Sequence, residues 1–242
     1  MKPLLLLSIV ALFSGCNKIY DAIHHGTSPT NCSINTVTDY IAGYNTITPR
    51  IATVHYNSSG NPESVTYDRR ETGYGWVFFK YDKLKRLIEL KEENSAIRKY
   101  VYNGYDSQPT HDTLWALTNP VVFIEYYTYD NKGRITKVAT KFYHSEDGET
   151  YPDSEVTYSY NAQGNLVGDF NYDDKISVFS THRLWMFIFH NYSVNNVANA
   201  VSYNSKGLPL DFTGSNVPGF TMNFFEGTFN GSQITYNCKG NR

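Results

Sequence analysis

The chain has 242 residues, with 21 lysines and arginines against 23 aspartates and glutamates, and a formal net charge of −2. Nucleic-acid-binding domains carry a clearly basic surface, which this balance does not predict, so we expect no nucleic-acid partner. Aromatic residues make up 16% of the sequence, including 21 tyrosines and 14 phenylalanines, and aromatic side chains favour β-strands. The composition therefore indicates an all-β protein, of a length that suits one large domain.

Residues 1–15 are typical of a secretory signal peptide. Residues 4–13 are almost wholly apolar and follow the basic Lys2. This run is too short to span a bilayer, which needs about 20 residues, but it fits the core of a signal peptide. Two small residues then precede Cys16, an arrangement that resembles the lipobox of bacterial lipoproteins. We therefore expect cleavage before Cys16 and a diacylglycerol lipid on its thiol.

Residues 16–45 are predicted to form a lipidated tether between the membrane and the folded domain. The segment is poor in aromatic residues and contains Ser-Pro-Thr at residues 28–30, which is typical of a linker. No aspartate directly follows Cys16, and such an aspartate would favour retention at the inner membrane. We therefore expect an outer-membrane lipoprotein that faces either the periplasm or the cell surface. Its contact with the membrane would be the lipid on Cys16, and residues 46–242 would form a single β domain.

A short turn pattern recurs through this domain: an aromatic residue, an Asn or Asp, two further residues, and a glycine. The five good copies begin at Tyr56, Tyr129, Tyr160, Tyr203 and Tyr236, and their glycines are Gly60, Gly133, Gly164, Gly207 and Gly240. A degenerate copy from Tyr81 has Lys85 in place of glycine. An Asn or Asp side chain accepts bonds from backbone N–H groups two residues on, and glycine adopts the positive φ that closes the turn. Each copy therefore predicts a hairpin turn.

The sequence between these turns is typical of β-strands. Residues 134–143, 156–160 and 220–229 are rich in β-branched and aromatic residues, and the first two stretches interleave polar residues with apolar ones. Counting both arms of each hairpin predicts about 12–14 antiparallel strands. We expect an all-β meander of hairpins, curled or closed into a soluble barrel-like sheet. Residues 36–44 and 181–198 are the expected helical or irregular exceptions.

Two resemblances follow from these motifs. The turns resemble the YD repeats of Rhs-type proteins, whose hairpins stack into large β-shells. The chain also resembles a family of Bacteroidota lipoproteins of unknown function with a porin-like β-barrel fold, on its lipobox, residues 191–196, 203–209 and 234–239. The second resemblance implies a barrel fold and an envelope location, and it carries over no catalytic residue. Because Lys137 and Lys141 interrupt the apolar pattern, a soluble barrel or curled sheet fits better than a membrane pore, which needs an unbroken apolar band.

Catalytic and metal-binding patterns are weak in this sequence. It contains no His-Glu-x-x-His, Cys-x-x-Cys or Gly-x-Ser-x-Gly motif, so we expect no zinc site, no cofactor and no serine-hydrolase elbow. The acidic residues Asp147, Glu149, Asp173 and Asp174 could serve glycoside hydrolysis if two of them were held across a cleft. We favour the simpler interpretation that they lie at solvated loop tips.

Aromatic side chains offer a second class of candidate, because tryptophan and tyrosine rings can stack on sugars. We expect Trp76, Trp115 and Trp185 to be core residues. Tyr74 and Trp76 are the best ligand candidates, because Gly73 and Gly75 suggest an exposed loop.

Cys32 and Cys238 are the two cysteines that follow Cys16. In an oxidising envelope such a pair is expected to be bridged. A meander that closes on itself would bring its first and last strands together, and the two cysteines with them. The alternative is a pair of unpaired thiols, because Cys32 falls within the expected tether and Cys238 at a turn position.

Three functions remain open. We favour a non-enzymatic binding or structural module that presents loops to a glycan, a lipid or a protein. A lipid or small-ligand carrier would instead need an internal cavity, typically of about 300–1,000 Å³. A glycan-directed hydrolase on a β scaffold would need two facing carboxylates in a deep polar pocket.

The lipid anchor can be tested by substitution. If Cys16 carries the lipid, Cys16→Ser should block processing and move the chain from the membrane fraction to the soluble fraction, because several buried acyl chains are needed for durable anchoring. The measurement is immunodetection of the full-length chain after a carbonate wash. A Cys16→Ser chain that stays membrane-bound would show that the anchor is elsewhere.

Overall fold

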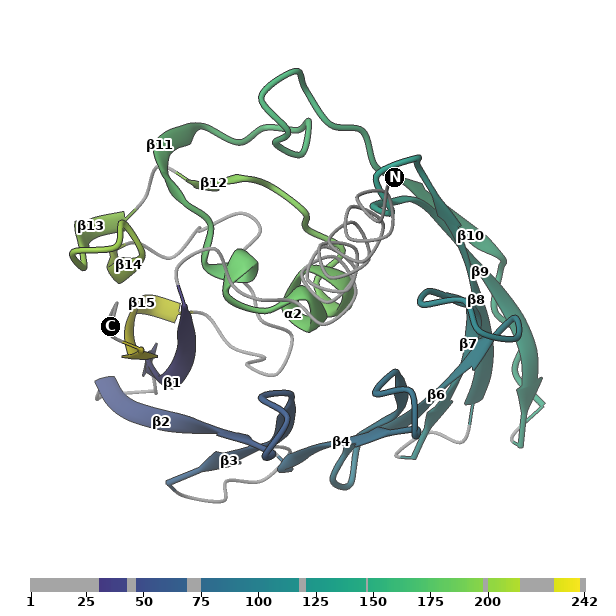
Figure 1. Ribbon diagram of the computed structural model, residues 1–242. Helices are drawn as coiled ribbons and strands as arrows, with labels where there is room; N and C mark the ends of the chain where they lie inside the picture. The colour runs from purple at the N-terminus through teal and green to yellow at the C-terminus, as the bar shows by residue number, and fades with distance from the viewer. Residues whose placement is uncertain are drawn as a thin grey trace, which may run out of the picture.

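The computed structural model describes residues 31–42, 47–68, 75–117, 121–146, 148–197, 200–213 and 229–239 (Figure 1). The expected signal peptide, Cys16, Tyr74, Gly240 and most of the expected strand at 220–229 lie outside these residues. Among the described residues, no helix is long and apolar enough to cross a lipid bilayer.

One antiparallel sheet of 13 strands makes up most of the described structure. Its strands are β1 (Cys32–Ala42), β2 (Ile47–Tyr56), β3 (Pro62–Tyr67), β4 (Val77–Tyr81), β5 (Leu87–Glu92), β6 (Ala96–Tyr102), β7 (Pro109–Ala116), β8 (Val121–Tyr129), β9 (Ile135–Ser145), β10 (Ser154–Thr157), β13 (Ala200–Tyr203), β14 (Pro209–Thr213) and β15 (Phe229–Cys238). From β1 to β10 each strand pairs with the next one in sequence, while β15 pairs with both β1 and β14. The predicted all-β meander and its approximate strand number are confirmed.

The sheet curls into a ring without closing into a barrel (Figure 1). Its edge strands are β10 and β13, and they do not pair with each other. The chain between these edges forms a two-stranded sheet from β11 (Tyr172–Ile176) and β12 (Asn195–Val197), a 3₁₀ turn η1 (Val178–Thr181) and a short helix α2 (Arg183–Ile188). The curled form of the prediction is therefore correct and the closed form is wrong, because this segment occupies the gap between the edge strands.

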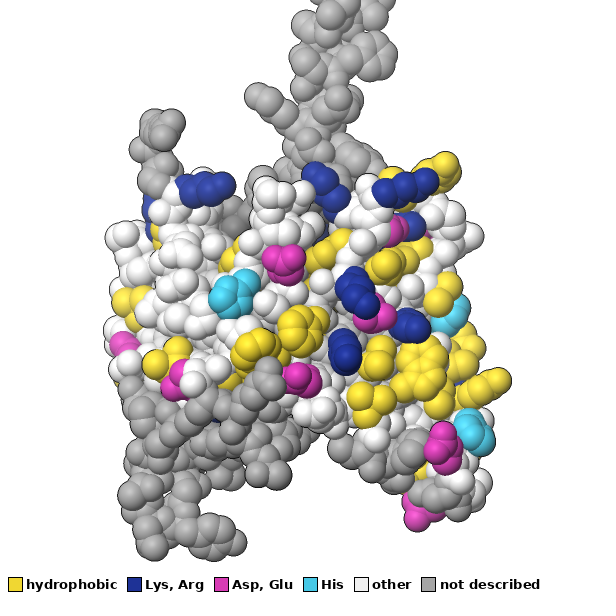
Figure 2. Space-filling model, turned by 90° about the horizontal axis from the view of Figure 1, so that it is seen from below, with side chains coloured by type: hydrophobic (Ala, Val, Ile, Leu, Met, Phe, Trp, Pro, Cys, Tyr) yellow, Lys and Arg dark blue, Asp and Glu magenta, His cyan; other side chains and the backbone are white. Residues whose placement is uncertain are grey.

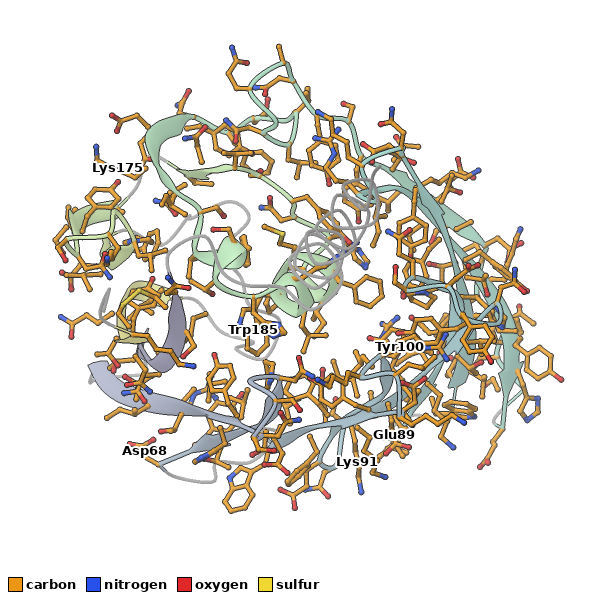
Figure 3. All side chains as sticks on the ribbon, viewed as in Figure 1. Asp68, Glu89, Lys91, Tyr100, Lys175 and Trp185 are labelled. Atoms are coloured by element: carbon orange, nitrogen blue, oxygen red, sulfur yellow. A yellow bond between two sulfur atoms is a disulfide. The ribbon has the colours of Figure 1, made fainter. Side chains whose placement is uncertain are left out.

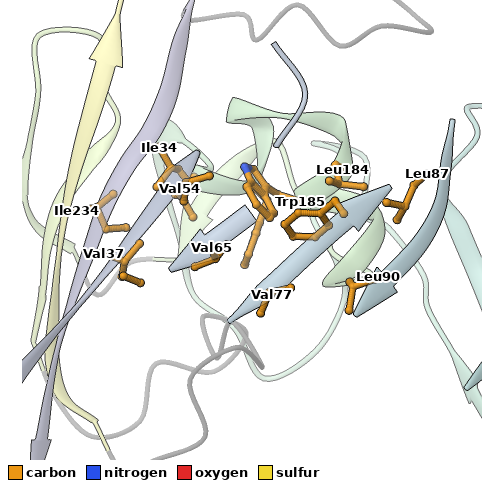
Figure 4. Packing of buried hydrophobic residues seen from close by; sticks show 14 of the residues in the cluster. Ile34, Val37, Val54, Val65, Val77, Leu87, Leu90, Leu184, Trp185 and Ile234 are labelled. Atoms are coloured by element: carbon orange, nitrogen blue, oxygen red, sulfur yellow. The ribbon is translucent and has the colours of Figure 1, made fainter. Parts of the chain in front are cut away.

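The hydrophobic core lies on the concave side of the sheet, against η1 and α2. In Figure 3, Trp185 and Tyr100 lie inside the ring, whereas Asp68, Lys91 and Lys175 lie on its outside. Trp185 is fully buried, and its ring centroid is 5.9 Å from that of Phe79 on β4. Valine, leucine and isoleucine side chains from successive strands pack around it (Figure 4). The sequence predicted a helical or irregular exception at residues 181–198, and the structure has α2 within this stretch. This helix packs inside the ring.

The outer face mixes charged and apolar side chains (Figure 2). Its ion pairs join neighbouring strands: Lys80 with Glu89 at 2.7 Å, Lys137 with Glu155 at 3.2 Å, and Lys141 with Asp153, on the loop before β10, at 2.7 Å. Exposed pairs of this kind contribute little to stability, typically less than about 1 kcal/mol.

Residues 36–42 correct two expectations. They belong to β1, which lies between β15 and β2, so the prediction of helical or irregular structure from residue 36 is wrong. The expected tether likewise cannot extend to residue 45, because residues 32–42 are part of the sheet. A register shift between Ile34 and Thr36 interrupts the alternation of buried and exposed positions, which explains why the sequence does not show a clear strand pattern here.

The turns have the predicted chemistry. In the turn at 130–134, Asp130 Oδ1 accepts bonds from the backbone N–H groups of Lys132 and Arg134, both at 2.9 Å. The positive φ predicted for Gly133 and Gly164 is confirmed at 73° and 89°, and Gly60 and Gly207 have φ of 83° and 78°. Lys85 adopts the same left-handed conformation, with φ of 62°.

The tyrosine that precedes each turn has a further role that the sequence did not reveal. Its hydroxyl donates a hydrogen bond to a backbone carbonyl in the adjacent, preceding strand. These bonds join Tyr56 to Ile34 (2.9 Å), Tyr81 to Pro62 (2.6 Å), Tyr102 to Leu87 (2.7 Å), Tyr129 to Pro109 (2.8 Å), Tyr160 to Ile135 (3.4 Å) and Tyr236 to Pro209 (2.7 Å). Tyr203 differs, because its hydroxyl donates to Asp173. Each tyrosine in this set therefore ties its own hairpin to the strand before it.

Cys32 and Cys238 form a disulfide, with the two sulfur atoms 2.06 Å apart. The cysteines are direct register partners in the β1–β15 ladder, and their Cα atoms are 4.0 Å apart. The expected bridge is therefore present, and it joins the first and last strands of the described structure.

Gly60 and Gly164 have the same left-handed backbone conformation but different neighbours, so substitutions at these two positions separate the effect of backbone strain from that of packing. A Cβ at Gly164 would lie 2.9 Å from Val194 Cγ2, whereas a Cβ at Gly60 would have no atom within 4 Å. Gly60→Ala should therefore cost only the left-handed backbone energy of about 1 kcal/mol, and Gly164→Ala should cost more, because the Val194 side chain must shift to admit the new methyl group. Urea denaturation of the two variants measures the difference. Equal losses of stability would contradict the packing described at Gly164.

Candidate functional site

A cavity of about 400 Å³ opens at the rim of the ring where the hairpin turns lie. Its lining comes from four parts of the fold: the turn between β2 and β3, the turn between β4 and β5, the loop between β6 and β7, and the segment around α2. The lining residues are Asn61, Tyr81, Lys83, Leu84, Lys85, Arg86, Leu87, Tyr102, Tyr105, Ser107, Gln108, Pro109, His182, Arg183, Leu184, Phe187 and Tyr192. Its volume falls within the range of small-molecule sites.

Aromatic rings form much of the cavity wall. Tyr81 and Tyr102 end β4 and β6, and their hydroxyls are already bonded to backbone carbonyls. Burial raises the pKa of both phenols well above the usual value, so they stay neutral at physiological pH. Phe187 of α2 adds a third ring to the lining. Tyr105 differs from these, because it is 88% exposed and stands at the mouth of the cavity.

Basic side chains surround the mouth, and one of them is fixed in place by the turn. Arg86 pairs with Asp82 at 2.7 Å, donates to the carbonyls of Gly104 and Asp106, and lies 4.3 Å from the centroid of the Tyr102 ring. Burial tends to raise the pKa of the Asp82 carboxyl, but the bonds from Arg86 outweigh it and hold that pKa below the usual value. Arg86 thus supports the wall of the cavity.

Three further cations line the cavity. Lys83 and Lys85 are exposed side chains of the turn between β4 and β5, and neither forms an ion pair with a described carboxylate. Arg183 begins α2, and its charge acts on the buried phenols of Tyr129 and Tyr192. The described lining residues include no aspartate or glutamate, so the mouth of this cavity is positively charged.

His182 contributes a neutral polar group to the lining. Its Nδ1 accepts a hydrogen bond from the backbone N–H of Leu184 at 3.1 Å, so the proton of the neutral ring resides on Nε2. Burial lowers the pKa of His182 to about 4. The ring is therefore uncharged at neutral pH.

A separate polar cluster lies deeper on the concave face. Arg98 of β6 donates to Asp112 of β7 at 2.8 Å and to Glu125 of β8, and Tyr127 donates to Asp112. Asp112 is fully buried. Burial raises its pKa to about 6, against the opposing effect of Arg98. No member of this cluster belongs to the cavity lining.

The sequence did not predict this pair of carboxylates. Asp112 and Glu125 are 13 positions apart in the chain, and they meet because they are direct partners in the β7–β8 register. Their oxygens bond to Arg98 and Tyr127, so the cluster is an internally bonded network. Its geometry supports a structural role in joining three strands.

The acidic residues singled out from the sequence lie elsewhere. Glu149 is exposed and accepts a hydrogen bond from Tyr151. Asp173 accepts from Tyr203 and from Asn196, and Asp174 pairs with Lys175 at 2.8 Å. Asp147 lies outside the described residues. None of the described three lines the cavity, and no group of three or more His, Cys, Asp or Glu within the described chain could hold a metal ion.

The three tryptophans also occupy positions outside the cavity. Trp185 is in the core, as expected. Trp76, the ligand candidate, is half-buried, packs against the core, and has its ring centroid 6.3 Å from that of Phe78. Trp115 is half-buried with Lys99 over its ring at 5.3 Å. The aromatic residues that do line the cavity are Tyr81, Tyr102, Tyr105, Phe187 and Tyr192. The sequence pattern had marked only Tyr81 among them, as the start of the degenerate turn copy.

Comparison with solved structures finds weak similarities. A Photorhabdus luminescens Tc holotoxin pore with a TccC3 mutation is 13% identical, with a TM-score of 0.30, over 68% of this chain and 8% of that chain. A TcdB2–TccC3–Cdc42 structure is 12% identical with a TM-score of 0.31, over 68% of this chain and 8% of that one. A TcdB2–TccC3–TEV structure is 13% identical with a TM-score of 0.31, over 77% of this chain and 9% of that one.

The chain thus covers less than a tenth of the length of these structures. Similarity at this level assigns neither a family nor a function to the chain. No protein-family model matches the sequence, and no curated protein matches it.

The buried histidines predict how stability depends on pH. Burial lowers the pKa of both His182 and His190 to about 4, from about 6.5 in an unfolded chain. Because the unfolded state binds these protons more tightly, stability is lost as pH falls from 6.5 to 4, by up to about 3 kcal/mol per histidine. Asp112 has the opposite effect on stability, because burial raises its pKa to about 6 in the folded state. As pH falls, the folded state binds this proton more tightly than the unfolded state, which offsets the loss of stability from one histidine.

His182→Asn isolates one of these contributions. Asparagine retains an acceptor for the Leu184 N–H but does not titrate. Urea denaturation at pH 7, 5.5 and 4 should show the variant losing about 3 kcal/mol less stability than the wild type between pH 7 and 4. Parallel pH curves for the two proteins would show that His182 is not neutral in the folded state.

Proposed function

We propose that the chain is a non-enzymatic binding module of the bacterial cell envelope, anchored through Cys16, which holds a small ligand in the cavity at the turn rim. The observation that carries the proposal is the cavity itself, with its aromatic wall and basic mouth. Ligand sites are concave, mostly apolar and equipped with a few polar groups that fix orientation. The cavity described here has each of these properties.

Binding is favoured over hydrolysis by the positions of the carboxylates. A glycan hydrolase needs an acid and a second carboxylate on either side of the bond to be broken. The described acids closest to that description, Asp112 and Glu125, are bonded to Arg98 and lie outside the cavity lining. Glu149 and Asp173, the acids that the sequence offers for a hydrolase, are also absent from the lining.

A lipid carrier is the second binding function, because the wall of the cavity is partly apolar. Leu84, Leu87, Leu184 and Phe187 contribute aliphatic and aromatic surface. A compact ligand is favoured over an acyl chain by the exposed Tyr105 and the lysines at the mouth, which suit a polar, ring-bearing molecule.

Tyr105 provides the test of this proposal. It lines the cavity with 88% of its surface exposed, while Tyr143 on β9 is 70% exposed and lies outside the lining. A panel of small sugars, nucleotides and fatty acids should be screened against the mature chain by ligand-observed NMR. We expect Tyr105→Ala to weaken binding of any hit by about tenfold, or about 1.4 kcal/mol, and Tyr143→Ala to leave it unchanged. Hits that bind the Tyr105→Ala variant as tightly as the wild type would contradict the proposed site.

A further inference from the structure

The charge of the cavity mouth narrows the class of ligand, on the basis of the function proposed above. The turn carboxylates Asp82 and Asp130 are each paired with the arginine four residues on, at 2.7 and 2.6 Å. Within each pair the aspartate and arginine charges cancel. The net charge of the rim is therefore set by other residues. Lys83 and Lys85 both line the cavity and both belong to the turn between β4 and β5.

Arg183 adds a positive charge to the cavity lining from a second element of the fold. It comes from α2, whereas the lysines come from the sheet. A Cβ added to Gly133 would lie 3.2 Å from Arg183 Nη2, so the guanidinium is held against the turn between β8 and β9. The cations therefore reach the cavity from two separate segments, an arrangement that can contact an anion from two directions.

The remaining polar lining suits a ligand with hydroxyl groups. Gln108 donates from Nε2 to the Gly133 carbonyl at 2.6 Å, which leaves its side-chain oxygen as an acceptor. Asn61 and Ser107 add a neutral amide and a hydroxyl to the same lining. Neutral donors and acceptors beside aromatic rings are the groups that bind sugars, through hydroxyl bonds and stacking against the ring face.

We propose that the cavity binds an anionic sugar, with the sugar ring against Tyr105 and its carboxylate or phosphate between Lys83, Lys85 and Arg183. The cationic side chains select a ligand that carries an anionic group, and the aromatic rings and neutral polar groups contact its sugar ring. A uronic acid and a sugar phosphate share this chemistry, and they differ in the geometry and charge of the oxyanion.

The test compares matched probes on the mature chain by isothermal titration calorimetry. The probes are digalacturonic acid, glucose 6-phosphate and the neutral disaccharide cellobiose, each at low and at physiological salt. We expect at least one anionic probe to bind at least tenfold more tightly than cellobiose, with an affinity that falls as salt rises. The anionic probe that binds more tightly shows whether the cavity prefers a carboxylate or a phosphate.

A double variant assigns that selectivity to the turn. Lys83→Gln with Lys85→Gln should weaken binding of the anionic probe at least tenfold more than binding of cellobiose, and it should reduce the salt dependence of the anionic probe. Lys132→Gln is the matched control, because Lys132 occupies the corresponding turn between β8 and β9 and does not line the cavity. Melting temperatures of both variants check that the fold is retained.

Two results would overturn the inference. One is equal affinity for cellobiose and both anionic probes, and the other is an anion affinity that survives the double lysine variant. If an uncharged ligand binds and Tyr105→Ala weakens it, the anionic specificity fails while the cavity remains the binding site. If no probe or panel member binds in a Tyr105-dependent way, the proposed function fails as well.

Discussion

The pairing of β15 with β1 is the constraint on which the rest of the structure depends. A simple meander would leave its first and last strands at opposite edges of the sheet, but here the final strand lies beside the first, with Cys32 opposite Cys238. The chain must therefore travel out along β1 to β10, cross over between the edges, and return through β13 and β14. That path is possible only when the sheet curls strongly enough for β10 and β13 to be joined by the intervening segment (Figure 1).

Curling creates an interior that must be filled. A ring of strands with an empty centre would expose one apolar face of every strand, at a cost of about 25 cal/mol per Å². The crossing segment fills this space with Trp185 and Phe179, which are both buried against the concave face. The same segment places Arg183, Leu184 and Phe187 beside the hairpin turns. The cavity is thus formed where the filling element meets the rim, and its lining combines residues that are about a hundred positions apart in the chain.

The turn pattern explains why so many aromatic rings stand at this rim. In an antiparallel meander every second connection lies at the same end of the sheet, so the repeat turns lie at one end of the ring. The tyrosine before each turn is positioned by its hydroxyl bond to the preceding strand, as Tyr81 is to Pro62 and Tyr102 to Leu87. A residue pattern that stabilises the hairpins therefore also supplies part of the wall of the cavity.

The sequence was informative where structure is determined locally. The turn at Asp130 and the positive φ of Gly133 follow from interactions within five residues. The candidate site was not predictable in this way, because Lys85 and Arg183 are brought together by the crossing segment. Asp112 and Glu125 meet only through strand register, and β1 was missed because its register shift disrupts the period-two pattern. Trp76, named as a weak ligand candidate for its flanking glycines, packs against the core, which agrees with the favoured expectation for the tryptophans.

The most direct test of this account is the disulfide state of the full-length chain extracted from a bacterial envelope without reduction. Alkylation of free thiols, proteolysis and tandem mass spectrometry would locate each cysteine. The account predicts a crosslinked peptide that joins Cys32 to Cys238, residues 206 positions apart in sequence. Recovery of both cysteines in alkylated form would contradict the pairing of the first and last strands in the register described.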